Sequence, residues 1–517
     1  MSAQDISPGT RPAGLKLSGP LLWTAGILLA AANFLAVLDM TIANVSVPNI
    51  AGGLGASNSQ GTWVLTSYSV AEAITVPLTG WLAARFGTVR VFITAMIGFG
   101  ICSALCGMAS SLAMLVTFRV LQGVAGGPLL PLSQTLLLHI FPKKHQPAAL
   151  GLWAMTTLIA PIAGPILGGQ LCDNLGWPSI FWVNVPIAFG AAPIIFGLLK
   201  SSETVTVKKP IDFIGLGLLV VAVGSLQIML DLGKDYDWFE SPIICALATI
   251  SAIGFATFLI WELTEAEPIV ALKVFRHRGF ATSMVTMALV FGAFYASNVL
   301  TPLWLQSNMG YTATWAGYAS GMMGILALVL APPTAVLSSK VDPRALIFIG
   351  VTWLGIVAFL WRGAANSDMA FWQVDIGTLM SGIGLPLFVL PINTMALASV
   401  EPEETASASG LLNFIRTISG AFGTSIANTV WENGATRNQA DLAGTLNGAE
   451  SAIDSLVASG MSSDQAVGAI TKLLQGQAIV LSTNQVFIGC AALFLVAAVT
   501  IWLAPKPTRV TGPNFGH

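Results

Sequence analysis

Long apolar segments, separated by short polar ones, run through almost the whole chain. A transmembrane helix needs about 20 predominantly apolar residues, and about fourteen segments have roughly that length. They cover residues 21–46, 62–84, 89–107, 112–139, 147–171, 178–199, 211–231, 241–262, 280–305, 314–339, 344–361, 370–398, 405–431 and 480–504. This pattern predicts an all-α polytopic membrane protein with about fourteen transmembrane helices.

Composition argues against a soluble enzyme. Of the 517 residues, 55% are hydrophobic and only 9% are charged, whereas soluble domains contain about 25% charged residues. The sequence has no legible set of nucleophile and base, no metal-binding cluster and no phosphate-binding loop. An enzyme is therefore the poorest interpretation, ATP is not the direct energy source, and no cofactor or metal is expected.

The basic residues predict the orientation, because cytoplasmic loops of membrane proteins carry more Lys and Arg than external ones. With the N-terminus in the cytoplasm, sixteen of the 22 basic residues fall in cytoplasmic loops or tails. The external loops hold four, namely Lys234, Arg362, Arg437 and Lys472, and the other two, Arg119 and Arg416, lie within spans. We therefore expect both termini in the cytoplasm.

One external loop, residues 432–479, is unusually long. It contains patterns typical of short amphipathic helices, such as SAIDSLVASG and SDQAVGAITKLL. Loops of this length usually have a function. We interpret the loop as a docking surface, and a tolerated insertion is the alternative.

The apolar stretch Asn33 to Pro48, NFLAVLDMTIANVSVP, contains an isolated carboxylate, Asp39. A charged side chain at mid-membrane costs about 2.5–3.5 kcal/mol, so it needs a partner or a water-filled cavity. Helical spacing allows Asn33, Thr41 and Asn44 to line one side of this helix with it. We interpret Asp39 as the proton-binding residue. The alternative is a fixed structural pair with Arg119, or a carboxylate bonded to Asn44.

Other membrane-embedded charges point to transport. Arg119 lies in the motif FRVLQGVAGGPLLP (residues 118–131), and Glu72 lies in the middle of the second span. Intramembrane charges of this kind are usually functional, although a long side chain can also reach the interface. Arg416, in NFIRTISGAFGTS, is as well explained by a structural contact as by function. Asn184 follows an aromatic interface segment and is a candidate for the substrate pocket, as are Asn33, Asn44 and Glu72.

Two further motifs predict close helix contacts, with ordinary basic turn residues as the alternative for the first and pure helix packing as the alternative for the second. The stretch GWLAARFGTVRVF joins the second and third spans, and we assign a cytoplasmic gate to Gly80, Arg85, Gly87 and Arg90. The run APIAGPILGG (160–169) predicts a bent, closely packed helix. Its bend-forming residues are Pro161, Gly164, Pro165, Gly168 and Gly169.

Together these motifs resemble the major facilitator superfamily, in its fourteen-span drug:proton antiporter branch, and are similar to EmrB-type multidrug exporters. The stretches that carry the resemblance include LDMTIANVSVP, RVLQGVAGGPLLPLSQTLLL, APIAGPILGG and GYTATWAG. The resemblance implies two six-helix halves, at 21–200 and 266–504, with two extra linking spans at 201–265 and cytoplasmic tails at 1–20 and 505–517. It also ties the RVLQG motif, which contains Arg119, to proton coupling. Asp39 and Glu72 are proton-coupling candidates because they lie within the membrane, not because of the resemblance. EmrB-type proteins need not have an acid at the position of Glu72, and we favour recognition of cationic substrates as its role, with proton transfer as the alternative.

The resemblance further implies partners and a location. EmrB-type pumps work in the bacterial inner membrane with a periplasmic membrane-fusion adaptor and an outer-membrane channel. This would explain the long external loop. One departure is notable: the superfamily's acidic residue between the second and third spans is absent, and Ala84 and Arg85 occupy that stretch. The charge relay there must be weaker or different.

The leading interpretation is a proton-driven exporter of hydrophobic or amphiphilic drugs. An exporter of fatty acids or of one dedicated metabolite on the same fold remains an alternative. A non-transporting membrane sensor or scaffold is the alternative from another class, but it would not need Asp39, Glu72 and Arg119 within the membrane.

Overall fold

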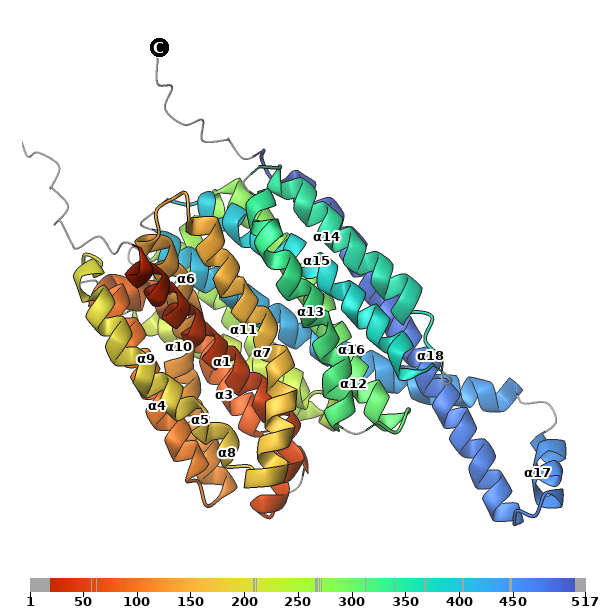
Figure 1. Ribbon diagram of the computed structural model, residues 1–517. Helices are drawn as coiled ribbons and strands as arrows, with labels where there is room; N and C mark the ends of the chain where they lie inside the picture. The colour runs from red at the N-terminus through yellow and green to blue at the C-terminus, as the bar shows by residue number, and fades with distance from the viewer. Residues whose placement is uncertain are drawn as a thin grey trace, which may run out of the picture.

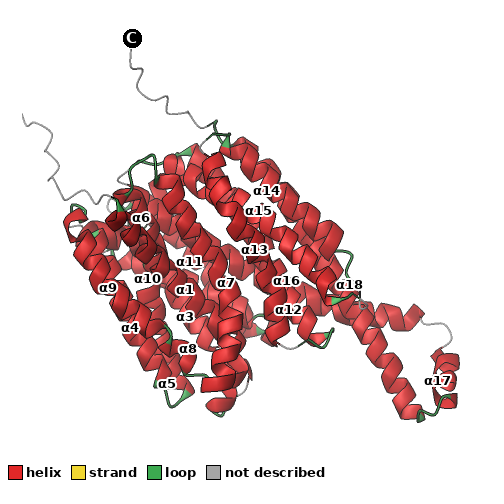
Figure 2. Cartoon of the chain, viewed as in Figure 1, coloured by secondary structure: helices red, strands yellow, loops and turns green. Residues whose placement is uncertain are grey.

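The computed structural model describes residues 19–506, apart from 57, 62, 208, 209, 211, 266, 267, 269, 271, 312, 339, 367, 368, 402, 403 and 446–448. The predicted cytoplasmic tails lie almost wholly outside the described residues, and so do the side chains of Pro161 and Pro165. The described residues form helices and no strand (Figure 2).

The helices follow the predicted apolar segments. They are α1 (Pro20–Gly53), α2 (Asn58–Gly61), α3 (Trp63–Phe86), α4 (Thr88–Gly107), α5 (Leu112–Gly126), α6 (Leu129–Ile140), α7 (Gln146–Leu175), α8 (Ser179–Trp182), α9 (Asn184–Leu199), α10 (Phe213–Leu232), α11 (Pro242–Thr264), α12 (Arg278–Ser307), α13 (Ala313–Ser338), α14 (Pro343–Val357), α15 (Phe371–Ala398), α16 (Thr405–Thr445), α17 (Ala449–Ala458) and α18 (Ser463–Thr500). Short 3-10 turns and one π-helical turn, η5 (Ala358–Arg362), complete the chain.

The prediction of an all-α polytopic membrane fold is confirmed. Within the described residues, eleven helical segments are long and apolar enough to cross a membrane. The helices α3, α7 and α16 are also long, at 24, 30 and 41 residues, but are not among these segments. The number of fourteen spans therefore stays a prediction.

Polar residues at the helix ends explain why several helices start where they do. The side chain of Ser111 accepts a hydrogen bond from the backbone N–H of Met114 at the start of α5. Asp212 and Asp342 cap α10 and α14 in the same way, and Ser462 forms a capping box with Gln465 at the start of α18. Such caps satisfy backbone donors that an apolar helix cannot satisfy itself.

The long helices form two bundles with the same order of packing. In the first, α1 packs against α6, α7 and α9, while α4 packs against α5 and α9. In the second, α12 packs against α15, α16 and α18, while α14 packs against α15 and α18. Figure 1 shows the first bundle in red to yellow and the second in green to blue. This grouping follows the predicted halves, whose residue boundaries stay predictions.

The bundles meet where α7 packs against α13 and α3 against α16. A side chain on Gly80 would meet the Ser407 Cα at 2.8 Å, so α3 and α16 approach closely there. Gln134 donates a 3.3 Å hydrogen bond to Asn393 across the same boundary. The linking helix α10 contacts both α3 and α16, whereas α11 packs mainly on α10.

The two ends of the molecule differ. Pro20 and Thr500 lie at one end, here called the terminal end, and α17 lies beyond the other, here called the hairpin end (Figure 1). The predicted external loop 432–479 is mostly helical: α16 continues to Thr445, and α18 begins at Ser463. Two membrane helices therefore extend beyond the bundle as a helical hairpin with α17 at its tip. The two predicted amphipathic patterns coincide with α17 and the start of α18.

Candidate functional site

A buried ion pair joins α1 to α5 inside the first bundle. Arg119 Nη1 lies 2.6 Å from Asp39 Oδ2. Asp39 is 2% exposed and Arg119 is 0% exposed. Each charge would be costly to bury alone, and their contact offsets part of that cost. The sequence singled out both residues, and the structure brings them together.

Two side-chain amides hold the other carboxylate oxygen. Gln122 Nε2 donates to Asp39 Oδ1 at 3.0 Å, and Asn184 Nδ2 donates to the same oxygen at 2.6 Å. Asn184 Nδ2 also donates to the Ser103 hydroxyl at 3.1 Å. Gln122 Oε1 in turn accepts from Arg119 Nη1 at 2.9 Å. Helices α1, α4, α5 and α9 thus meet at one carboxylate, and these residues are called the Asp39 cluster below.

Helix α3 supplies further contacts of the arginine. Arg119 Nε donates to the Val64 carbonyl at 3.1 Å, and its guanidinium carbon lies 4.2 Å from the centre of the Tyr68 ring. Arg119 Nη2 and the Tyr68 hydroxyl are buried and have no hydrogen-bond partner. The cluster therefore keeps unused polar groups beside its ion pair, which is unusual for a purely structural contact.

Small residues make this approach possible. A side chain on Gly123 would meet the Ala71 Cβ at 2.8 Å, and one on Gly127 would meet the Thr75 Cβ at 2.9 Å. Both glycines lie close to α3, as the small-residue spacing in the arginine motif predicts. They bring α5 near enough for Arg119 to reach the α3 backbone.

A second set of charges lies between the two bundles. Glu72 on α3 and Arg416 on α16 are both buried, at 6% and 7% exposure, but no ion pair joins them among the described residues. The Arg416 guanidinium carbon lies 6.0 Å from the ring centres of Trp153 on α7 and Phe291 on α12. Arg416 thus contacts aromatic side chains of both bundles.

The predicted pocket residues on α1 have different surroundings. Asn33 donates to the hydroxyls of Thr156 and Thr157 at 2.9 and 2.7 Å, which ties α1 to α7. Asn44 is exposed. Asn184, also predicted for the pocket, lies in the Asp39 cluster instead. Their roles in substrate binding stay predictions.

The glycine- and proline-rich run lies on α7, which continues as a helix through it. A side chain on Gly164 would meet Thr41 of α1, including its Cβ at 2.6 Å, so the two helices are in close contact. Gly168 is buried, and a side chain on Gly169 would meet nothing within 4 Å.

The predicted gate residues cluster at the terminal end. Gly87 has a φ of +94°, which favours glycine, and a side chain there would meet the Glu203 carboxylate. That carboxylate accepts from the backbone N–H of Arg90 at 3.0 Å. The Arg85 guanidinium carbon lies 5.6 Å from the centre of the Phe86 ring. Of the four, Gly80 makes the contact with the other bundle.

Comparison with known proteins agrees with this architecture. A family model described as Major Facilitator Superfamily matches residues 29–424, which is more than half of the chain. The chain belongs to the major facilitator superfamily. It is therefore a membrane transporter protein by family, and the predicted resemblance is confirmed.

Similar proteins are named as exporters or resistance proteins. The chain is 42% identical to Multidrug export protein EmrB of Escherichia coli (strain K12), over 97% of this chain and 98% of that protein. It is 40% identical to Fatty acid resistance protein FarB of Neisseria gonorrhoeae, over 96% of this chain and 98% of that protein.

Solved structures share the fold at low sequence identity. The human organic anion transporter MFSD10 superposes with a TM-score of 0.60 at 14% identity, covering 94% of this chain and all of that one. A bacterial homologue of the lysosomal transporter Spinster gives 0.53 at 17% identity, over 95% of this chain and all of that one.

The Asp39 cluster brings a carboxylate, a guanidinium and two side-chain amides together. Within the described residues, no group of His, Cys, Asp and Glu could bind a metal ion. Sequence reasoning missed Gln122, Ser103 and Tyr68. The only available signal was the spacing of Gln122, three residues after Arg119, which places both on one helix face.

Proposed function

We propose that this protein exports hydrophobic and amphiphilic drugs in exchange for protons. One observation carries the proposal: a titratable carboxylate, Asp39, is buried at the meeting point of four helices with Arg119 as its only charged partner among the described residues. Buried ionisable groups of this kind mark proton relays in transporters. The family and the relatives' names support the export of drugs.

In the proposed cycle, the Asp39 cluster opens alternately to the two sides of the membrane. A proton from outside neutralises Asp39 and weakens its attraction for Arg119. The helices that meet there can then repack, and the two bundles rock about the site between them. Release of the proton to the cytoplasm restores the ion pair.

The proposed substrate path runs between the bundles, where Glu72 and Arg416 lie on facing helices. Aromatic side chains such as Trp153 and Phe291 offer apolar contact to varied ligands. Glu72 would favour cationic drugs, although it could also carry protons. Asn33 and Asn44 are the proposed polar contacts on α1.

Fatty acids are a second candidate substrate. FarB, named as a fatty acid resistance protein, is 40% identical to this chain, as is EmrB of Haemophilus influenzae. A fatty acid is an amphiphile, so the same route between the bundles would serve it. The two candidates differ in the charge of the ligand.

We also propose a bacterial inner-membrane location with both termini in the cytoplasm, from the distribution of basic residues. The helical hairpin would then lie in the periplasm. There it could dock a membrane-fusion adaptor that leads to an outer-membrane channel. A cysteine introduced at Ser451 of a cysteine-free variant should react with an impermeant maleimide in intact cells; labelling only after lysis would contradict this topology.

Reconstituted protein tests the export function. Liposomes containing the purified protein should accumulate a fluorescent amphiphile when a proton gradient is imposed, and should release protons as they do so. The variant Asp39→Asn keeps size and hydrogen bonding but cannot titrate. Gradient-coupled uptake by this variant would refute Asp39 as the coupling residue. If the wild-type protein transports nothing, the alternative of a sensor or scaffold is favoured.

A further inference from the structure

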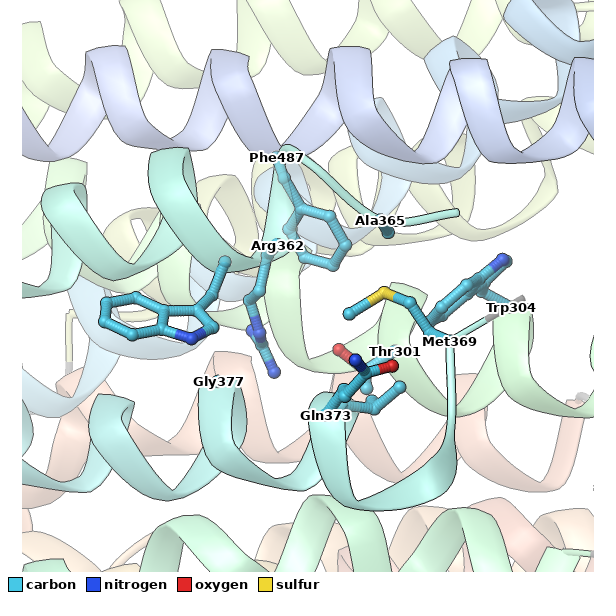
Figure 3. Close-up of a pocket in the computed structure, with 10 residues that line it drawn as sticks. Thr301, Trp304, Arg362, Ala365, Met369, Gln373, Gly377 and Phe487 are labelled. Atoms are coloured by element: carbon cyan, nitrogen blue, oxygen red, sulfur yellow. The ribbon is translucent and has the colours of Figure 1, made fainter. Parts of the chain in front are cut away.

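The second bundle contains a cavity in the place that the Asp39 cluster occupies in the first. The cluster joins α1, α4, α5 and α9. The cavity is lined by α12, by the η5 turn that ends α14, by α15 and by α18. Because the two bundles repeat the same order of packing, these four helices correspond one to one. An arginine, Arg362, lies in the wall of the cavity (Figure 3).

Arg362 is turned into the bundle. It ends the apolar helical segment Pro343–Arg362, where a long side chain can reach the membrane surface. Instead its Nη2 lies 3.4 Å from the Thr378 hydroxyl of α15, and its guanidinium carbon lies 5.1 Å from the centre of the Phe487 ring of α18. The π-helical turn η5 positions it, and such turns are frequent at functional sites.

Arg362 has no carboxylate partner among the described residues. In the first bundle Arg119 is bonded to Asp39. Within the described part of the chain Arg362 forms no ion pair, and Asp375 on the facing helix does not pair with it. Its one hydrogen bond, at 3.4 Å, is long for a charged donor. An arginine in this setting lacks the negative charge that would offset its burial.

A second donor at the cavity is also unused. Trp304 lines it, is 2% exposed, and its Nε1 has no hydrogen-bond partner. Buried donors are normally paired. The other lining residues include Met369, Gln373 and Phe487, and no Asp or Glu is among them. Figure 3 shows the indole nitrogen of Trp304 at the end of its ring away from Arg362. The cavity therefore offers one positive charge, with largely apolar surface around it.

The size of the cavity limits its ligand. Its volume is about 20 Å³, and a single water needs about 10–15 Å³. A drug-sized molecule needs roughly 300–1,000 Å³, so only one small group fits. Arg362 also borders a second cavity, of about 10 Å³, lined by Ser297, Asn298 and Ser381.

We propose that the Arg362 cavity is a carboxylate-binding site. The carboxylate would be bound by Arg362, either as a free small acid or as the head group of an amphiphilic acid. In the second case the site would bind the substrate, so this inference rests on the proposed export of amphiphiles. It would supply to the second bundle the negative charge that Asp39 supplies to the first.

Equilibrium binding of radiolabelled octanoate to the full-length protein in nanodiscs tests the site. Octyltrimethylammonium is the matched cationic probe, and empty nanodiscs give the lipid background. Arg362→Gln should weaken octanoate binding about tenfold, as expected for loss of a charged hydrogen bond, and should leave cation binding unchanged. The control Arg437→Gln removes the same charge from an exposed position on α16 and should change neither.

Two milder variants and a competitor complete the test. Arg362→Lys should retain part of the affinity, and Trp304→Phe, which removes only the N–H on the side away from Arg362, should leave octanoate binding unchanged. If acetate competes with octanoate, the site binds free small acids. If acetate does not compete, the site binds amphiphilic acids. Unchanged octanoate binding in Arg362→Gln, or equal loss of both probes, would overturn the proposal. If Arg362→Gln does not fold, octanoate binding by Arg362→Lys that equals wild-type binding would overturn the proposal.

The assay uses no proton gradient. A failure of Asp39 to couple transport would leave these binding results unchanged, so the two proposals can fail separately.

Discussion

Asn184 donates a hydrogen bond of 2.6 Å to the Asp39 carboxylate, across 145 positions of the chain. The same amide nitrogen reaches Ser103, so one side chain ties the carboxylate to both α4 and α9. Asp39 is therefore fixed from three directions, by Arg119, Gln122 and Asn184. Any change in its charge alters the contacts of every helix around it.

The first prediction concerns the stability of the ion pair. Asp39→Asn leaves Arg119 buried without a counter-charge, and breaking a buried pair in this way costs about 3–5 kcal/mol. The double variant Asp39→Asn/Arg119→Gln should recover much of that loss. Thermal unfolding in detergent measures both. Neither variant should couple transport to protons, so the recovery of stability can be distinguished from a recovery of function. Equal stability of the single and double variants would contradict the pairing of Asp39 with Arg119.

The second prediction concerns Glu72. Glu72→Gln should reduce resistance to cationic drugs about tenfold, since a charged contact contributes roughly 1.5–3 kcal/mol, and should affect neutral drugs less. Growth of an efflux-deficient host on both drug classes measures this. Glu432→Gln, which alters a half-exposed acid paired with Lys234, is the control. Equal loss for both classes would indicate that Glu72 carries protons.

The third prediction concerns the contact between Gly80 and Ser407. Valine at Gly80 would force α3 and α16 apart, because even a Cβ meets the Ser407 backbone. Transport should fall severely while the protein still inserts. Gly190 on α9 has nothing within 4 Å of the corresponding Cβ position, so Gly190→Val is the matched control. Normal transport by Gly80→Val would show that this contact plays no part in the cycle.

The fourth prediction is a pH dependence at the start of α14. Hydrogen bonds from the Arg344 side chain lower the pKa of Asp342 below its usual value of 3.8. A lowered pKa means that the carboxylate stabilises the folded state above about pH 4 and that this contribution is lost as the pH falls. Asp342→Asn should therefore cost up to about 1 kcal/mol at pH 7 and progressively less in acid.

Ser111→Ala is the matched control for this measurement. It removes a cap that does not titrate, so its cost should be the same at both pH values. Thermal unfolding of the two variants at neutral and acidic pH makes the comparison. A pH-independent cost for Asp342→Asn would contradict the ionised cap.

The fifth prediction concerns the hairpin. Deletion of residues 440–475 should leave the membrane bundles folded and gradient-driven transport in liposomes intact, because the deleted residues lie outside both bundles. Drug resistance of cells should fall if the hairpin docks an adaptor. Cross-linking in intact cells, with a photoreactive group at Val457 on α17, checks the docking; full resistance after the deletion would refute it.

The sequence predicted most of the fold because apolar length alone identifies membrane helices. It also identified Asp39 and Arg119, since charges are conspicuous in apolar stretches. Gln122 and Ser103 were not identified because a polar, uncharged residue in a membrane helix has many possible partners. Their role depends on which helices meet, and one sequence does not state that.

Two differences between prediction and structure have physical causes. The predicted spans ended at 431 and 480, where apolarity ends, but α16 and α18 continue because no proline interrupts the helical segments there. Arg362 was assigned to an external loop because a charge usually ends a span. The π-helical turn and its contact with Thr378 bring it into the bundle instead.

The unbroken helices α16 and α18 connect the second bundle directly to the tip of the hairpin. A 41-residue helix is about 60 Å long at 1.5 Å per residue, about twice the thickness of the hydrocarbon core. Its membrane part contacts α3, α10 and α12, and its far part carries the hairpin. A small tilt of the second bundle is therefore magnified at the tip, so a protein bound there would be pushed and pulled once in every transport cycle.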